Sequence, residues 1–255
     1  MEIEKLNTER DEVIMRYTTI LLDADETLLD FSKTEERALR KSFEKFALPY
    51  EKRIHLLYHE INQNLWHEFS MGRMDKPTLT VRRFELLFDE IGVRQDVLAF
   101  KECYEGWIAK GFDTIAGAET LLQTLRGMGC ALYCVTNGLK RSQYPRLTGA
   151  GLIGYFEKLF ISEEAGSQKP QKEYFDFVFR NLSEKDKTKI LLVGDSLTTD
   201  IQGGITAGLD TVWYNPTRAA RPDGSPKPTY EAASLGEIPE IVRGAPRESE
   251  REIRP

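Results

Sequence analysis

The segment ILLDADETLLDF (residues 20–31) places two carboxylates, Asp23 and Asp25, directly after an apolar run. A run such as Ile20, Leu21 and Leu22 usually lies in a protein core, where an uncompensated charge is costly. We therefore expect a buried strand that ends in two acids, and a further group nearby that compensates their charge.

Five short runs rich in apolar or β-branched residues are the main structural signal in the chain. They are YTTILL (17–22), ALYCVT (131–136), KLFIS (158–162), KILLVG (189–194) and DTVWYN (210–215). Each is too short for a core helix and lacks clean alternation, which is typical of strands buried on both faces. Helical spacing occurs between the last four runs, over 140–148, 172–182 and 198–207. This order predicts a doubly wound α/β core, with a parallel sheet covered by helices on both faces.

Residues 33–112 differ from the rest because they contain no strand-like run and four amphipathic stretches. The apolar faces are Leu39, Phe43 and Phe46; Ile54, Leu57, Tyr58, Ile61 and Leu65; Phe84, Leu87, Phe88 and Ile91; and a stretch from about Asp96 to Ala109. We expect an inserted all-helical cap over the carboxyl edge of the sheet. The predicted core is then 16–32 with 113–242, between an N-terminal extension (1–15) and a flexible C-terminal tail (243–255).

The charge, cysteine content and hydropathy of the chain argue against several classes of protein. The 255 residues carry 35 basic and 41 acidic side chains, for a net charge of −6, so no basic excess suggests a nucleic-acid partner. The three cysteines show no CxxC spacing, which argues against a disulfide framework and favours a reducing compartment. No apolar stretch is long enough for a signal-peptide core or a membrane span. We expect a cytoplasmic protein without a membrane partner, and the sequence does not indicate its oligomeric state.

Polar side chains follow three of the predicted strands. DADET follows the first, TNG (136–138) the second, and GDSLTTD (194–200) the fourth. Lys169 stands before Pro170 at the expected start of a further helix, where proline suits the first turn. Ligands bind outside the carboxyl ends of strands in an open parallel sheet, so these segments should meet at one edge.

Bringing the four acids Asp23, Asp25, Asp195 and Asp200 to one edge without a cation would be unfavourable. Two like charges at about 4 Å cost roughly 4 kcal/mol even at an effective dielectric of about 20. These segments offer oxygen ligands and no histidine or cysteine, which favours Mg²⁺ with its waters and a substrate phosphate. Thr136 and Lys169 add donors that could neutralise phosphoryl oxygens.

The order Asp23-x-Asp25-x-Thr27, Thr136, Lys169 and Gly194-Asp195-x4-Asp200 resembles the haloacid dehalogenase (HAD) superfamily of phosphohydrolases with a helical cap, over about residues 16–242. DADETLLDF, NLWHEFSMGRM, VTNG, ISEEAGSQKPQKEYFD and VGDSLTTDIQGGITAGL are together similar to the bacterial pyrimidine nucleotidase branch. Members of that branch hydrolyse nucleoside 5′-monophosphates. The resemblance thus implies a Rossmann-like core and a small phosphomonoester substrate.

The resemblance also implies a role for each site residue. Asp23 would be the nucleophile that forms an aspartyl phosphate, and Asp25 the general acid and base. Mg²⁺ would be bound by Asp23, the main-chain carbonyl of Asp25 and Asp195, with Asp200 in support. The phosphoryl oxygens would be held by Thr136, Lys169 and backbone N–H groups near Asn137. A second aspartate at position 25 separates the phosphatases from the dehalogenases, so dehalogenation is disfavoured.

Each of these residues alone also has a structural explanation, and only their joint order favours a catalytic site. An EF-hand loop from Asp23 is excluded, because Leu28 and Thr34 stand where Gly and Glu are required. GAGLIG (149–154) matches a dinucleotide fingerprint but follows a helical segment, so we interpret it as a helix end. No P-loop motif occurs. A phosphatase for a sugar phosphate or phosphoglycolate and a non-catalytic phosphate-binding module stay as alternatives.

The cap contains residues whose roles the sequence leaves open. His55 and His59 have the i, i+4 spacing of a metal site but no evident third ligand, which favours an exposed helix face. Trp66, Phe69 and Met71 line either a base pocket or the cap core, and the core is favoured for at least half of them. Candidates for contact with a pyrimidine base are Phe31, Asn62 and Asn64.

Overall fold

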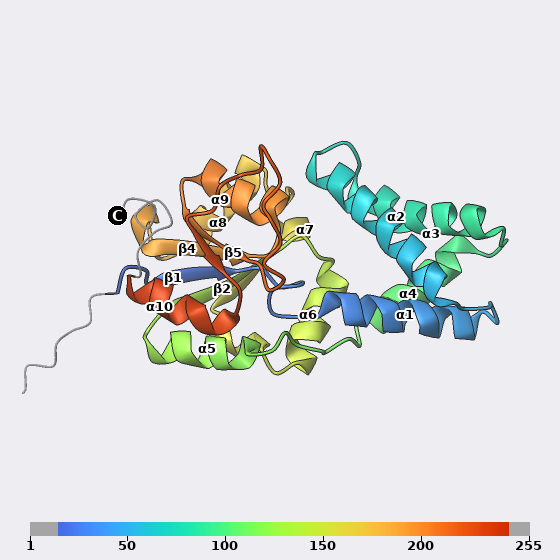
Figure 1. Ribbon diagram of the computed structural model, residues 1–255, viewed down its shortest axis with the longest axis horizontal. Helices are drawn as coiled ribbons and strands as arrows, with labels where there is room; N and C mark the ends of the chain where they lie inside the picture. Colours follow the sequence, from blue (N-terminus) through green and yellow to red (C-terminus); the bar gives the residue numbers. More distant parts are fainter. Residues whose placement is uncertain (1–14, 245–255) are drawn as a thin grey trace, which may run out of the picture.

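The computed structural model describes residues 15–244 (Figure 1). Its sheet has six parallel strands in the order β3-β2-β1-β4-β5-β6. The strands are β1 (Thr19–Leu22), β2 (Ala131–Thr136), β3 (Lys158–Ile161), β4 (Ile190–Gly194), β5 (Asp210–Tyr214) and β6 (Tyr230–Ala232). The five predicted strands and the doubly wound parallel sheet are confirmed.

Helices cover both faces of this sheet. They are α5 (Ala118–Gly127), α6 (Lys140–Gly149), α7 (Ser162–Ala165), α8 (Lys172–Asn181), α9 (Gln202–Ala207) and α10 (Ile238–Arg243). Figure 1 shows α5 and α10 on one face and α8 and α9 on the other. Two clusters of buried apolar residues separate these helices from the sheet, one on each face. The near-continuous burial of the strands therefore explains their uninterrupted apolar sequence.

Four helices form the cap that follows β1: α1 (Phe31–Lys45), α2 (Lys52–Ser70), α3 (Lys76–Ile91) and α4 (Val97–Ile108). The side chains of Asp30, Asp75 and Asp96 accept hydrogen bonds at the starts of α1, α3 and α4, as N-capping residues do. Most residues of the predicted apolar faces meet in one cluster that includes Phe43, Tyr58 and Phe84, whereas Leu65 packs with Phe69 and Leu79 in a second, smaller cluster of the cap. The helical periodicity of the apolar residues in 33–112 therefore reflects burial inside the cap itself.

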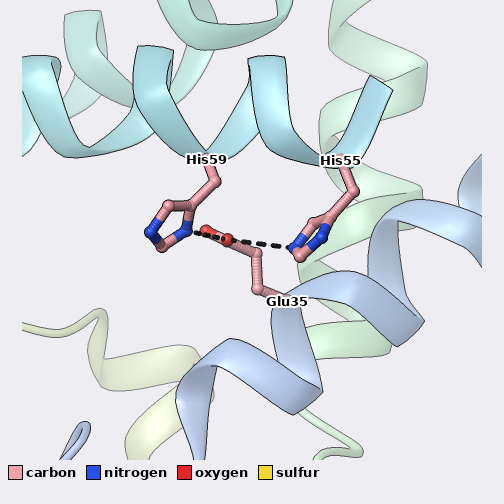
Figure 2. Close-up of side chains that lie close together, drawn as sticks. All are labelled: Glu35, His55 and His59. Atoms are coloured by element: carbon pink, nitrogen blue, oxygen red, sulfur yellow. Dashed lines mark hydrogen bonds and ion pairs between the residues drawn. The ribbon is translucent and has the colours of Figure 1, made fainter. Parts of the chain in front are cut away.

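The exposed face expected for His55 and His59 is only half-exposed. Figure 2 shows Glu35 of α1 between the two imidazoles of α2. The Glu35 side chain is fully buried, and 17% of the His55 and 41% of the His59 side chain are exposed. A residue that lies 20 positions before His55 supplies the partner, so spacing within α2 could not reveal it.

Several local expectations need correction. Helix α8 begins at Lys172, so Pro170 lies before its N-cap residue Gln171 rather than in its first turn. The segment predicted as one helix over 198–207 starts with a π-helical turn (Leu197–Ile201) before α9. GAGLIG is confirmed as a helix end, because α6 ends at Gly149 and Gly151 has a φ of 73°.

Some elements of the structure were not predicted from the sequence. Strand β6 and helices α5 and α10 were not predicted, since β6 has only three residues and α10 only six. Most of the N-terminal extension and of the C-terminal tail lies outside the described residues. The domain boundaries at residues 33 and 112 stay a proposal. Within residues 15–244, no helix has both the length and the apolar character that a membrane span requires.

Candidate active site

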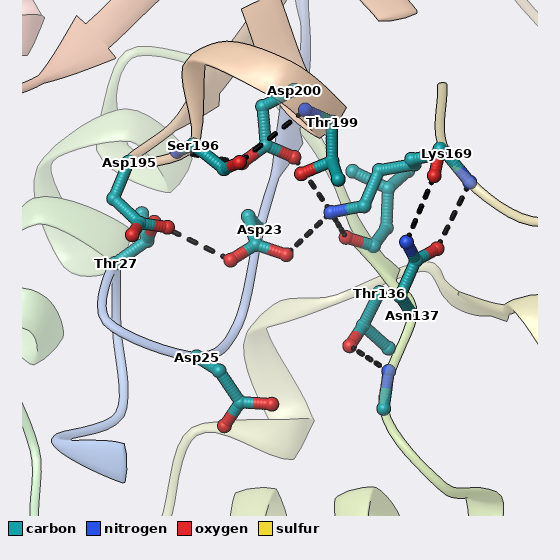
Figure 3. A network of polar contacts seen from close by, with 12 residues as sticks. Asp23, Asp25, Thr27, Thr136, Asn137, Lys169, Asp195, Ser196, Thr199 and Asp200 are labelled. Carbon is teal, nitrogen blue, oxygen red and sulfur yellow. Dashed lines mark hydrogen bonds and ion pairs between the residues drawn. The ribbon is translucent and has the colours of Figure 1, made fainter. Parts of the chain in front are cut away.

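The carboxyl ends of the three central strands bring the predicted site residues together (Figure 3). Strand β1 pairs with β2 through Leu22 and Cys134 and with β4 through Leu22 and Val193. The backbone N–H of Asp23 continues the ladder by donating to the carbonyl of Val193 at 2.9 Å. The residues that follow β1, β2 and β4 therefore emerge side by side, although Thr136 lies 113 positions after Asp23 and Asp195 a further 59 positions along the chain.

Lys169 is the cation that compensates the acids. Its Nζ donates to Asp23 Oδ1 at 2.5 Å, to Asp200 Oδ1 at 2.7 Å and to the carbonyl of Val135 at 2.8 Å. The lysine is 1% exposed. Burial opposes its charge, but Asp200 and Asp23 outweigh burial and raise the pKa of Lys169. Asp23, which follows β1, and Asp200, which follows β4, thus share the ammonium group of Lys169.

One ammonium group does not neutralise the whole acidic cluster. Burial raises the pKa of Asp23 to about 7, with Lys169 opposing this rise and Asp200 adding to it. Burial, Asp23 and Asp200 likewise raise the pKa of Asp195. Carboxylate oxygens of Asp23, Asp195 and Asp200 lie within 4.8 Å of one another. An all-oxygen donor set with excess negative charge fits a hard divalent cation.

Hydrogen bonds and close packing hold Asp195 and Asp200, the two acids that follow β4, in place. The indole Nε1 of Trp213 on β5 donates to the carbonyl of Asp195 at 2.8 Å. The backbone N–H of Ser196 donates to Asp200 Oδ2 at 3.1 Å, so both oxygens of Asp200 are engaged within the protein. A Cβ at Gly194 would collide with the Asp200 carboxylate, which explains the glycine at this position. Asp200 is therefore suited to position Lys169 as well as to support a cation.

The carboxylate of Asp25 lies apart from this cluster and has partners of its own. Arg146 of α6 forms an ion pair with its Oδ1, and Gln143 donates to its Oδ2 at 2.5 Å. Both partners are buried, and the sequence analysis missed both. Gln143 and Arg146 are spaced i, i+3 on the helix that follows TNG, which places both side chains on one helix face. This spacing is the sequence feature from which a shared role could have been predicted.

Thr136 and Asn137 contribute in different ways. The hydroxyl oxygen of Thr136 accepts from the N–H of Gly138 at 3.0 Å and from Gln143 at 3.2 Å. The side-chain amide of Asn137 makes a reciprocal pair with the backbone of Lys169, with both distances at 2.9 Å. Thr136 is thus connected to Asp25 through Gln143, whereas the Asn137 side chain fixes the loop that carries the lysine.

A cavity of about 210 Å³ lies between these residues and the cap. The core contributes the predicted catalytic residues together with Ser142, Gln143 and Arg146. The cap contributes Phe31, Asn62, Gln63, Trp66, Arg83, Tyr104, Glu105 and Ile108. Of the cap residues named from sequence, Phe69 is in the cap core, and Asn64 and Met71 are exposed, Met71 by 54%. The arrangement therefore combines buried carboxylates, a buried lysine and space for a polar ligand in one cavity.

Comparison with known proteins identifies the fold and the family. A family model of haloacid dehalogenase-like hydrolases matches residues 17–208. The chain belongs to the haloacid dehalogenase-like hydrolase family. This HAD hydrolase is 40% identical over 232 residues to the HAD-hydrolase YfnB of Bacillus subtilis (strain 168), covering 89% of this chain and 96% of YfnB. A magnesium-bound crystal structure of YfnB matches with a TM-score of 0.84, over 89% of this chain and 99% of that chain.

Two further relatives carry a substrate class in their names. The pyrimidine 5′-nucleotidase PynA of Streptococcus pneumoniae (strain ATCC BAA-255 / R6) is 35% identical, over 88% of this HAD hydrolase and 94% of PynA. The pyrimidine 5′-nucleotidase YjjG of Escherichia coli (strain K12) is 32% identical, over 89% of this chain and 99% of YjjG. The similarity extends across the core and the cap of the HAD hydrolase rather than over the core alone.

Lys76 of α3 ties the cap of this HAD hydrolase to the catalytic edge. Its Nζ donates to the carbonyl of Asn137 at 2.7 Å, to the hydroxyl of Ser162 at 2.7 Å and to the carbonyl of Gly138 at 3.3 Å. These bonds cross the boundary between cap and core and contact the backbone of the TNG segment. The position of the cap is therefore coupled to the loop beside Thr136.

Lys76 is expected to stabilise the HAD hydrolase more at alkaline than at neutral pH. Burial lowers its pKa from 10.5 to about 8, with Glu163 opposing. Between about pH 8 and pH 10.5 the unfolded chain binds more protons than the folded chain, so stability rises with pH. The Tm of the wild type minus the Tm of Lys76→Met should therefore increase when the pH is raised from about 7.5 to about 9.5.

A matched control for this measurement is Lys172→Met, which removes an exposed lysine that pairs with Asp176. Its effect on Tm should change little over the same range of pH. If Lys76→Met shows the same constant offset as the control, the lowered pKa of Lys76 is contradicted.

Proposed function

We propose that this HAD hydrolase is a Mg²⁺-dependent 5′-nucleotidase that hydrolyses pyrimidine nucleoside monophosphates. The observation that carries the proposal is the contact of the buried Asp23 carboxylate with Lys169 at 2.5 Å, inside an acidic cluster that borders a cavity shared with the cap. The names of PynA and YjjG support the pyrimidine nucleotide as substrate class.

Asp23 is the nucleophile of the proposed reaction. Its carboxylate attacks phosphorus and the bond to the ribose 5′ oxygen breaks, which leaves an aspartyl phosphate. Asp25 protonates the departing oxygen and then accepts a proton from the water that hydrolyses the intermediate. Arg146 and Gln143 hold the Asp25 carboxylate, and Thr136 and Lys169 donate to the phosphoryl oxygens.

Asp23 and Asp195 would bind Mg²⁺ together with the main-chain carbonyl of Asp25, and Asp200 would support the site. When bound, the cation supplies charge neutralisation for the carboxylates and for the phosphoryl oxygens. The raised pKa values of Asp23 and Asp195 support this assignment, because burial and the neighbouring carboxylates disfavour the charged form of both acids, and a bound cation would favour it.

The leaving nucleoside occupies the cap side of the cavity in this proposal. Four buried polar atoms of the residues that line the cavity have no hydrogen-bond partner within the described part of the chain. They are Tyr104 Oη, Ser142 Oγ, Gln143 Oε1 and an Nη atom of Arg146. Buried polar groups are costly unless they are hydrogen-bonded, so these atoms favour a leaving group rich in donors and acceptors.

A panel of phosphorylated metabolites tests the substrate class. UMP, dUMP and dTMP should be hydrolysed with a kcat/KM at least about tenfold above that for ribose 5-phosphate and phosphoglycolate, because the smaller substrates leave the cavity's polar atoms unpaired. Removing divalent ions with EDTA should abolish turnover, and added Mg²⁺ should restore it. A preference for a sugar phosphate would exclude the nucleotidase, and absence of hydrolysis of any phosphomonoester, including an aryl phosphate, would exclude a phosphatase.

A further inference from the structure

A second cluster of ligand-type side chains lies in the cap, away from the catalytic acids. Glu35 Oε2 is 2.7 Å from His59 Nδ1 and 3.7 Å from His55 Nε2 (Figure 2). The candidate ligand atoms of all three residues lie within 4.8 Å of one another. They come from two helices, α1 and α2, that pack side by side in the cap.

Both imidazoles face one oxygen of the buried Glu35 carboxylate, but at different distances. Burial raises the pKa of Glu35, but the two histidines outweigh this effect and lower it. The hydrogen bond to Glu35 raises the pKa of His59. His55 Nε2 is buried and has no hydrogen-bond partner among the described residues, although it faces the same carboxylate oxygen.

The surroundings of Glu35 resemble those of a metal-binding carboxylate. Asn62 Nδ2 donates to the other oxygen, Oε1, at 2.8 Å, which leaves Oε2 directed between the two imidazoles. Outer hydrogen bonds of this kind orient metal ligands. Ligand atoms of a tetrahedral zinc site lie about 3.3 Å apart, given bonds of about 2.0 Å, so small side-chain rotations would suffice here.

We propose that Glu35, His55 and His59 form a binding site for a transition metal ion of the zinc class, separate from the Mg²⁺ site. Two imidazoles and one carboxylate form a ligand set that zinc uses in proteins, with a fourth position left for water. Imidazole ligands favour Zn²⁺, Co²⁺ or Ni²⁺ over Mg²⁺. The partial exposure of His59 gives the ion a route from solvent.

The site adjoins the cavity wall through one residue. Asn62, which holds Glu35, also accepts from Arg83 at 3.4 Å through Oδ1 and lines the cavity. An ion bound by Glu35, His55 and His59 would therefore tie α1 to α2 at the point where the cap borders the cavity. We expect it to stabilise the folded protein, because it binds the native state and not the unfolded chain.

A titration of the full chain with Co²⁺ in saturating Mg²⁺ tests the proposal, with Mg²⁺ occupying the catalytic acids. Saturable binding of one Co²⁺ per chain, with visible d–d absorption and displacement by Zn²⁺, is the expected result. His59→Ala and Glu35→Gln should each weaken binding at least about 100-fold, since loss of a ligand exceeds the 10–100-fold cost of losing an outer hydrogen bond. Zn²⁺ should raise the Tm of the wild type but not of His59→Ala.

Two control variants test whether residues outside the proposed site bind the Co²⁺ ion. His67→Ala removes the third histidine of the sequence, an exposed residue on the same helix, and should retain Co²⁺ binding. Asp195→Asn should also retain it, because the catalytic acids are not involved. The proposal is overturned if no saturable binding occurs, if His59→Ala binds Co²⁺ as tightly as the wild type, or if Asp195→Asn abolishes binding. Folding of each variant is checked by circular dichroism.

Discussion

Asp23→Asn is expected to lower kcat by about 10⁴- to 10⁶-fold, the range in which loss of a nucleophile falls. The amide cannot form an acyl phosphate, so the covalent route is closed. The fold should be retained, because an asparagine oxygen can still accept from Lys169 at the position of Asp23 Oδ1. Steady-state hydrolysis of UMP, together with circular dichroism, measures both effects.

Asp186→Asn is the matched control for this variant. Asp186 is an exposed acid that caps the short helix Lys187–Lys189, and asparagine can also serve as a cap. The control should retain wild-type kcat. If Asp23→Asn loses less than about tenfold in kcat, a difference of about 1.4 kcal/mol in barrier, Asp23 is not the nucleophile.

Asp25→Asn is expected to lower kcat for nucleotides by about 10²- to 10⁴-fold, as removal of a general acid and base does. Both half-reactions should suffer with UMP, because its leaving ribose oxygen needs a proton and the second water must lose one. The neutral side chain also leaves Arg146, which is 1% exposed, without its ion-pair partner. A fold control by circular dichroism is therefore part of this experiment.

The choice of leaving group distinguishes the two roles of Asp25. With p-nitrophenyl phosphate the leaving group needs no protonation, so phosphorylation of Asp23 should proceed while hydrolysis of the intermediate is slow. We expect a burst of p-nitrophenol and accumulation of phosphorylated protein by mass spectrometry after an acid quench. If Asp25→Asn slows phosphorylation by p-nitrophenyl phosphate as much as it slows hydrolysis of the intermediate, the assignment of Asp25 as an acid for the leaving group is wrong.

The strands and the order of the site residues could be predicted because both depend on local sequence. Strands buried on both faces need apolar residues at every position, and this pattern is visible in ILL (20–22) and in ILLV (190–193). Since parallel strands end at one edge, the acids that follow β1 and β4 had to be neighbours. The contacts among Asp23, Asp195 and Asp200 follow from that topology.

Partners from distant segments were not predictable in the same way. Arg146 and Glu35 are charged residues on helices, and such residues most often face solvent. Only the packing of α6 against the catalytic loop and of α1 against α2 turns these two side chains inward. Strand β6 was missed because three residues carry too little periodicity to be separated from a loop.

The sequence by itself determined the class of fold, the helical insertion after β1 and the chemical types of the groups at the carboxyl edge, because apolar periodicity and strand order suffice for these. The tertiary structure alone decided which polar side chains pair with one another: Lys169 with Asp23 and Asp200, Arg146 with Asp25, and His59 with Glu35. The physical reason is that burial makes every unpaired charge costly, whereas the choice of partner depends on side-chain positions that local spacing does not encode.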